Sequence, residues 1–172
     1  MRPDRGRRVI VRRARTGDIR AIRSLVDTYT GDRRLLSKAT VTLYEQVQEF
    51  WVAEDEGGRV AGCGALHVMW EDLAEIRTVA VDPDLRGRKI GHKIVAALLD
   101  QARELGVRRV FCLTFETRFF GSFGFTEIDG APVPHPVYEQ LLRSYDEGVA
   151  EFLDLERVKP NTLGNKRMLL HL

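Results

Sequence analysis

The chain has 172 residues, of which 44% are hydrophobic, and its formal net charge at pH 7 is +2. This length fits one domain, and the apolar content is sufficient for a core that needs no disulfide or metal staples. The sequence holds no apolar stretch long enough to span a bilayer and no hydrophobic segment of the secretory type near residue 1, so we expect neither a membrane protein nor a secreted one. A cytoplasmic, reducing location is the expectation that follows.

The charge is unevenly distributed along the chain. Residues 1–15 hold seven Arg and one Asp, which gives this stretch +6 and leaves −4 for the remainder. A basic arm of this kind can contact nucleic acid, or it can resemble an organelle transit peptide. Because residues 9–11 already have the pattern of a strand, we expect residues 1–7 to be a loose basic tail before an edge strand, with no nucleic-acid partner.

Two cysteines are present, and both lie in apolar runs. The surroundings of Cys63 and Cys112 indicate buried, reduced thiols. The sequence has no CxxC pair and no Cys/His ligand spacing, so we expect no metal site. A nucleophilic role for Cys63 is disfavoured because no His/Asp arrangement accompanies it.

The first half of the sequence predicts a strand, two helices and an antiparallel meander. Thr16 has the character of a helix N-cap, and apolar residues from Ile19 to Tyr29 then recur at helical spacing. A second short helix is indicated between Val41 and Val47. Strands are expected at residues 8–13, 50–54, 60–70 and 74–81, with a glycine-containing turn at residues 55–58.

The second half alternates helix and strand. Helices are expected at residues 90–105, 116–123 and around 141–145, and strands at residues 109–114, from 125 onward and at 168–172. Gly106 stands where a C-cap glycine belongs. The succession predicts an α/β fold in which a mixed sheet is flanked by helices, within a single domain over residues 1–172.

The turn that follows the strand at residues 74–81 has the features of a phosphate site. A proline ends the strand, and a turn with two glycines and three cations opens a helix at residue 90. Backbone N–H groups at a helix start point at any anion placed there, and the helix dipole adds favourable potential. The pattern is neither a Walker A motif nor a Rossmann fingerprint. The alternative interpretation is a solvated loop before an amphipathic helix.

This turn also carries a resemblance to a known family. The stretch Arg86-Gly87-Arg88-Lys89-Ile90-Gly91 resembles the acetyl-CoA motif Arg/Gln-x-x-Gly-x-Gly/Ala of the GNAT acetyltransferases, with Lys89 at the place of the first motif glycine. Residues 12–18 are similar to the family's opening strand and helix, and residues 119–125 to its late helix and the Gly-Phe pair after it. The resemblance implies the GNAT fold, a mostly antiparallel, twisted sheet that is splayed at the acetyl-CoA site and flanked by helices.

The same resemblance implies acetyl-CoA as co-substrate. Val79 and Val81 would pair their backbones with the pantetheine amides, as an added strand does. A backbone N–H at Val79 or Ala80 would polarise the thioester carbonyl. The pyrophosphate would be held by the turn, namely by Arg86, Gly87, Arg88, Lys89, Gly91 and His92. Because backbone N–H groups form this cradle, a lysine at position 89 does not prevent binding.

A departure from the family pattern bears on the substrate. Many GNAT enzymes carry a tyrosine in the late helix as general acid, whereas this chain has Phe120, which cannot donate a proton. In this, and in residues 35–50, 74–83 and 165–169, the chain resembles the acetyltransferase domain of N-acetylglutamate synthases. Residues 144–155 add a similarity to their short, single-domain actinobacterial form. The resemblance implies acetylation of the α-amine of L-glutamate or L-glutamine, the first step of arginine biosynthesis.

Glutamate presents two carboxylates, so its pocket needs at least two cationic or strong-donor anchors. Arg77 is the best bidentate candidate, because it lies on the strand that leads to the acetyl site. Lys38 would bind a substrate carboxylate by resemblance, and Asn165 and Lys166 are further donors. Each has the alternative interpretation of an ordinary surface side chain.

The attacking amine must lose a proton, and Glu75 is the candidate general base, acting through water. Strict alternation would place Glu75, Arg77 and Val79 on one face of the strand, where Glu75 and Arg77 could instead form a simple salt bridge. His67 is a weaker candidate base. The general acid stays unassigned.

Two other functions are compatible with these residues. One is a GNAT enzyme that acetylates another small amine or a protein N-terminus, and the other is a non-catalytic acetyl-CoA-binding sensor, which Phe120 keeps open. The sequence is compatible with a homodimer but does not determine the oligomeric state. It also does not indicate whether arginine inhibits the protein by feedback.

Overall fold

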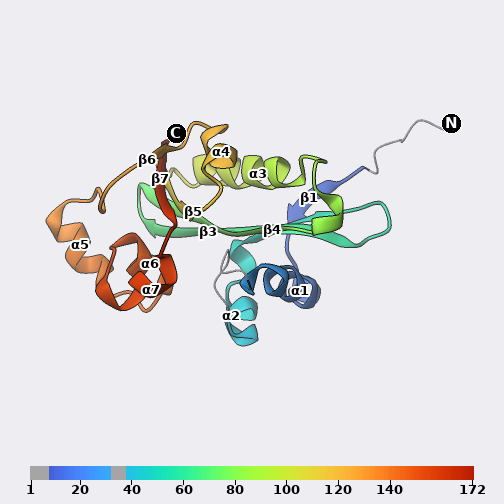
Figure 1. Ribbon diagram of the computed structural model, residues 1–172, viewed down its shortest axis with the longest axis horizontal. Helices are drawn as coiled ribbons and strands as arrows, with labels where there is room; N and C mark the ends of the chain where they lie inside the picture. The colour runs from blue at the N-terminus through green and yellow to red at the C-terminus, as the bar shows by residue number, and fades with distance from the viewer. Residues whose placement is uncertain (1–7, 32–37) are drawn as a thin grey trace. The chain divides into compact units, whose positions relative to one another are not determined.

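The computed structural model describes residues 8–31 and 38–172, and the basic tail expected at residues 1–7 lies outside them (Figure 1). The strands are β1 (Ile10–Arg13), β2 (Phe50–Glu54), β3 (Val60–Trp70), β4 (Leu73–Val81), β5 (Arg109–Thr114), β6 (Thr126–Glu127) and β7 (Lys166–His171). The α-helices are α1 (Ile19–Thr30), α2 (Thr40–Glu45), α3 (Ile90–Glu104), α4 (Thr117–Gly121), α5 (His135–Leu141), α6 (Glu147–Phe152) and α7 (Lys159–Thr162). Short 3-10 turns are η1 (Thr16–Asp18), η2 (Val47–Glu49), η3 (Pro83–Leu85) and η4 (Glu156–Val158).

The strands form one seven-stranded sheet in the order β1-β2-β3-β4-β5-β7-β6. The pairs β1–β2, β2–β3, β5–β7 and β6–β7 are antiparallel, and β4 pairs with β5 in parallel. The register of the parallel pair runs from Leu73 opposite Arg109 to Glu75 opposite Phe111. The predicted mixed, mostly antiparallel sheet with flanking helices is therefore confirmed.

The chain packs into two compact units. The first unit comprises residues 1–66 and 78–101, and the second comprises residues 67–77 and 102–172. Strands β3 and β4 each supply residues to both units. The single domain expected over residues 1–172 stays a prediction.

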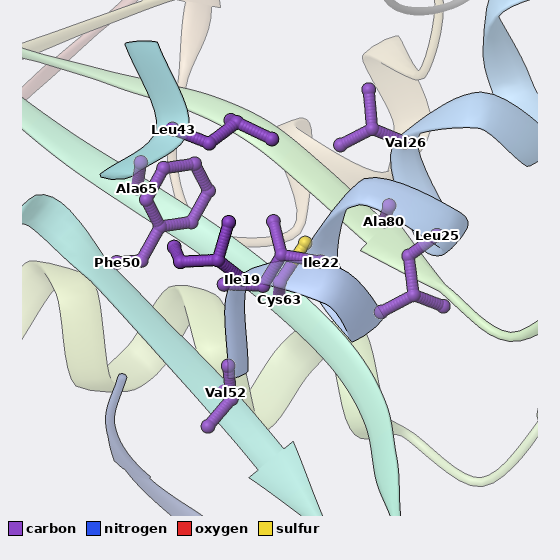
Figure 2. Packing of buried hydrophobic residues seen from close by; sticks show 10 residues of the cluster. All are labelled: Ile19, Ile22, Leu25, Val26, Leu43, Phe50, Val52, Cys63, Ala65 and Ala80. Carbon is purple, nitrogen blue, oxygen red and sulfur yellow. The ribbon is translucent and has the colours of Figure 1, made fainter. Parts of the chain in front are cut away.

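In the first unit, α1 and α2 bury their apolar faces against one side of the strands (Figure 2). Ile19, Ile22 and Val26 recur at helical spacing on α1 and are fully buried, together with Leu43 of α2. The opposite side of β3 receives α3 (Figure 1). Gly64 permits this close approach, because a Cβ there would lie 2.7 Å from Ile94 Cγ2. Gly64 thus sets how closely α3 packs on β3.

The core of the second unit is built around two fully buried aromatic rings. Phe111 of β5 and Phe152 of α6 meet edge to face, with ring centroids 5.0 Å apart. The Arg167 guanidinium lies 5.0 Å from the centroid of Phe111, and it donates hydrogen bonds to the carbonyls of Glu151 at 2.8 Å and Gly130 at 2.9 Å. Arg167 therefore ties the end of α6 to this core.

Three local expectations need correction. Thr16 is not an α-helical N-cap, because it begins the 3-10 turn η1 that precedes α1. The helix expected around residues 141–145 is wrong, since α5 ends at Leu141 and Tyr145 is 99% exposed. The helix α6 begins instead just after Asp146, whose side chain accepts a hydrogen bond from the Val149 N–H as an N-cap does.

Candidate functional site

The end of β4 is anchored to the rest of the first unit by Asp82. Its backbone N–H donates to the Ala61 carbonyl at 2.9 Å, and its carboxylate accepts from the Asp84 N–H at 2.9 Å and pairs with Arg59. Asp82 is buried while Arg59 is exposed. These bonds fix the point at which the chain leaves the strand and enters the turn before α3.

The turn before α3 presents backbone and cations to solvent. Residues 86–89 are exposed, and Gly87 and Lys89 have left-handed φ angles of +83° and +59°. The α-helical bonding of α3 begins with the Lys93 N–H donating to the Lys89 carbonyl at 3.1 Å. The N–H groups of the preceding first turn therefore have no intrahelical acceptor and point out of the helix start. Together with the positive dipole end and Arg86, they fit a pyrophosphate.

Tyr29 of α1 contacts both the strand end and the turn. Its hydroxyl donates a hydrogen bond to the Val81 carbonyl, and the Arg86 guanidinium lies 5.9 Å from its ring centroid. A cation at this distance over an aromatic ring is weakly attracted to it. The sequence pattern assigned Tyr29 only to the apolar face of a helix, so this contact was missed, and no local signal separates the two roles.

Thr78 is a conformational outlier within β4. Its φ is +57°, which is rare for a β-branched residue and costs on the order of 1–3 kcal/mol. A left-handed residue interrupts the two-residue alternation of a strand. Simple alternation therefore does not extend from Arg77 to Val79, and it no longer supports the expectation that Val79 shares a face with Glu75 and Arg77.

A charged cluster occupies the second unit. Arg77 donates two hydrogen bonds to the Asp146 carboxylate, at 2.7 and 3.0 Å, and its Nη1 lies 3.7 Å from Glu75 Oε2. The side chains of Glu75 and Arg77 are 4% and 10% exposed. The structure thus contains the ion pair of Glu75 and Arg77 that was the alternative interpretation. Asp146 also belongs to this charged cluster, and the sequence did not indicate it.

The carboxylate of Asp146 is ionised in this setting. Burial acts to raise its pKa, but the hydrogen bonds and charge of Arg77 outweigh burial and lower the pKa to about 2. His67, the weaker candidate base, points Nε2 toward the same carboxylate at 3.7 Å. Asp146 is therefore a common partner of two residues that the sequence had singled out.

The other predicted substrate residues are spread over the chain. Lys38 belongs to the first unit, where its Nζ lies 3.3 Å from Gln46 Oε1. Asn165 and Lys166 belong to the second unit: the Asn165 N–H donates to the Thr162 carbonyl, and Lys166 begins β7 with an exposed side chain. Their substrate roles stay predictions.

Comparison with known proteins identifies the family of this chain. Residues 19–125 match the acetyltransferase (GNAT) family. The chain belongs to the GNAT acetyltransferase family. It is 65% identical over 165 residues to the amino-acid acetyltransferase of Mycobacterium tuberculosis, covering 95% of this chain and 94% of that protein.

Two solved structures have the same fold. The crystal structure of Rv2747 from Mycobacterium tuberculosis, in complex with CoA and NLQ, has a TM-score of 0.92 at 65% identity, with 95% of this chain and 99% of that chain covered. The N-acetylglutamate synthase of Neisseria gonorrhoeae, complexed with coenzyme A and N-acetyl-glutamate, has a TM-score of 0.76 at 24% identity. That match covers 96% of this chain but 35% of the larger protein, and it bears on the fold alone.

As in other GNAT enzymes, the co-substrate is acetyl-CoA. Among residues 8–31 and 38–172, no group of three His, Cys, Asp or Glu side chains could hold a metal ion. In the same ranges no helix has the length and apolar character needed to cross a membrane.

Cys63 is fully buried, and burial raises the pKa of its thiol to about 12, so a thiolate nucleophile is disfavoured there.

Phe120, at the place of the GNAT tyrosine, is a core residue of α4. It is 6% exposed and packs edge to face with Phe119 at 5.0 Å and with Phe125 at 5.4 Å. Neither neighbouring ring can donate a proton. The structure therefore explains the phenylalanine by packing and leaves the general acid unassigned.

Lys89 occupies a motif position at which GNAT enzymes usually have glycine, and its φ of +59° explains why. We expect Lys89→Gly to stabilise the protein by about 1 kcal/mol, because glycine adopts this conformation without the penalty of a Cβ. The same change should weaken CoA binding a few-fold through loss of a cation. Urea unfolding and calorimetric titration with CoA would measure the two effects.

Lys89→Ala is the matched control, since it removes the cation but keeps a Cβ in the left-handed conformation. We expect it to weaken CoA binding as Lys89→Gly does, without the gain in stability. Equal stabilities of the two variants would contradict the role assigned to the backbone angle.

Proposed function

We propose that the chain transfers the acetyl group of acetyl-CoA to the α-amine of L-glutamate or L-glutamine. The observation that carries this proposal is the similarity of 95% of the chain, at 65% identity, to a protein named amino-acid acetyltransferase and to a solved structure that holds CoA and NLQ. The choice of L-glutamate or L-glutamine follows from the resemblance of residues 35–50, 74–83 and 165–169 to N-acetylglutamate synthases.

The first unit would hold the co-substrate. The start of α3 and the turn from Arg86 to His92 offer backbone N–H groups and cations for the pyrophosphate. Val79 and Val81 would offer backbone groups to the pantetheine, and a backbone N–H at Val79 or Ala80 would stabilise charge that develops on the thioester oxygen. The Val81 carbonyl already accepts from Tyr29, so we assign the pairing at Val81 chiefly to its N–H.

The second unit would supply the base. Glu75 is a buried carboxylate on β4, next to a fixed cation. In the proposed reaction Glu75 takes a proton from the substrate amine through water, and the nitrogen lone pair attacks the thioester carbonyl. The C–S bond then breaks, and CoA leaves as the thiolate. Arg77 and Lys38 remain the proposed contacts for substrate carboxylates, and Arg77 is also held by its bidentate pair with Asp146.

An amino-acid panel tests the proposal. The purified chain, acetyl-CoA and each of the twenty amino acids would be assayed for thiol release. We expect turnover with L-glutamate or L-glutamine at least about ten-fold above the other amino acids, because the pocket must match two polar groups of the substrate. D-glutamate serves as the control for stereochemical fit.

Two other outcomes would contradict the proposal. Turnover only with other amines or with protein N-termini would indicate a GNAT enzyme of different substrate class. CoA binding without turnover of any amine would indicate a sensor. A place at the first step of arginine biosynthesis, a cytoplasmic location and a homodimer belong to the same proposal, and size-exclusion chromatography with light scattering tests the homodimer.

A further inference from the structure

The charged cluster of the second unit is held by a residue outside the strand that carries it. Glu75 and Arg77 lie on β4, whereas Asp146 lies 69 residues beyond Arg77 along the chain. The Arg77 fork meets the Asp146 carboxylate with two bonds of 2.7 and 3.0 Å, which is the bidentate geometry that fixes a guanidinium in position and in plane. The orientation of Arg77 beside Glu75 is therefore set from Asp146.

Asp146 is itself held in place by the helix that it opens. Its Oδ1 accepts from the Val149 N–H at 3.0 Å, so the same carboxylate caps α6 and binds Arg77. Gly148, in the first turn of α6, brings the helix backbone against the cluster. A Cβ at this position would lie 2.5 Å from Arg77 Nη1 and 2.6 Å from Glu75 Oε2. The start of α6 thus fits the two charged ends with no room for a methyl group.

We infer that Asp146 is a positioning residue for acetyl transfer, which together with Gly148 of α6 holds the Arg77 guanidinium beside the Glu75 carboxylate. This inference rests on the proposed function, because it assumes that Glu75 acts on the substrate amine. Asp146 acts through Arg77 and is not assigned a contact with substrate. A displacement of about 1 Å at a reacting group can cost on the order of 100-fold in rate, so the placement of this pair is a sensitive quantity.

Asp146→Asn is the decisive variant. Asparagine caps helices about as well as aspartate, so α6 should keep its start while the charged bidentate pair with Arg77 is lost. We expect kcat/KM with the amino-acid substrate to fall about 10- to 100-fold, with CoA affinity within about two-fold of the wild type. Glu147→Gln is the matched control, because it removes a carboxylate from the next residue, where Glu147 forms an exposed pair with Arg157 at 2.8 Å.

Two further variants separate positioning from a loss of folding. Gly148→Ala keeps every charge and should lower kcat/KM, because the added methyl group displaces the charged ends of Arg77 and Glu75. This variant tests the inference if Asp146→Asn does not fold. Adding Asp146→Asn to Arg77→Gln should cost little beyond Arg77→Gln alone, because Asp146 acts through Arg77.

The kinetic outcomes are distinct. If the Asp146→Asn and Gly148→Ala variants fold and match the kcat/KM of Glu147→Gln, the inference about Asp146 is overturned while the proposed function stands. A wild-type chain that binds CoA but acetylates no amino acid would overturn the proposed function, and the inference with it.

Discussion

Replacing Glu75 with glutamine is expected to lower kcat about 10²- to 10⁴-fold, because a neutral amide cannot accept the proton of the attacking amine. Glu75 is 3% exposed, and the side chains are nearly equal in size, so the packing around position 75 should persist. Arg77 keeps its bidentate pair with Asp146 in this variant. We therefore expect CoA affinity and the unfolding midpoint to stay close to those of the wild type.

The pH dependence and a control variant sharpen this test. The activity of Glu75→Gln should rise with pH more steeply than that of the wild type, because a larger fraction of the amine is then deprotonated in solution. Glu71→Gln changes an exposed carboxylate four residues earlier and should leave kcat unchanged. A Glu75→Gln enzyme with wild-type kcat at neutral pH would exclude Glu75 as the general base.

Replacing Phe111 with alanine is expected to destabilise the protein by about 3–5 kcal/mol, which is a large part of the free energy of unfolding of a typical domain. The Phe111 side chain is fully buried and packs edge to face on Phe152. Its ring also lies under the Arg167 guanidinium, whose N–H groups hold the carbonyls of Glu151 and Phe152 at the end of α6. The substitution removes apolar burial and leaves a cavity beside a partly buried cation.

Thermal and urea unfolding would measure the loss. The expected change corresponds to a fall in Tm of about 6–20 °C for a protein of this size. Phe115→Ala is the control, because Phe115 is 41% exposed, and it should cost about 1 kcal/mol or less. Equal losses for the two variants would show that Phe111 is not the centre of this core.

Local patterns were sufficient to predict most of the strands and the turn before α3, whose cofactor role stays a prediction. Strands β2, β3 and β5 have the predicted bounds, because each is an apolar run that turn or charged residues delimit in the sequence. The turn from Arg86 to Gly91 was found from its glycines, its cations and its place between strand and helix. Such signals depend only on neighbours in the sequence.

The parts that were missed depend on contacts between distant residues. Asp146 meets Arg77 across 69 residues and Tyr29 meets Val81 across 52, and neither pair leaves a local signature. The helix α6 has six residues, too few to show a helical repeat. The left-handed angle of Thr78 was also unreadable, because a threonine within a strand pattern predicts extended backbone.

The identity of the acetylated product tests the proposed acetylation of L-glutamate or L-glutamine most directly. The purified chain would be incubated with acetyl-CoA and L-glutamate, and separately with L-glutamine, and the products identified by mass spectrometry beside a measurement of released CoA. We expect N-acetylglutamate or N-acetylglutamine in equal amount to the CoA released, with the acetyl group on the α-nitrogen. CoA released without an acetylated amino acid, or no reaction with either substrate while CoA binds, would contradict it.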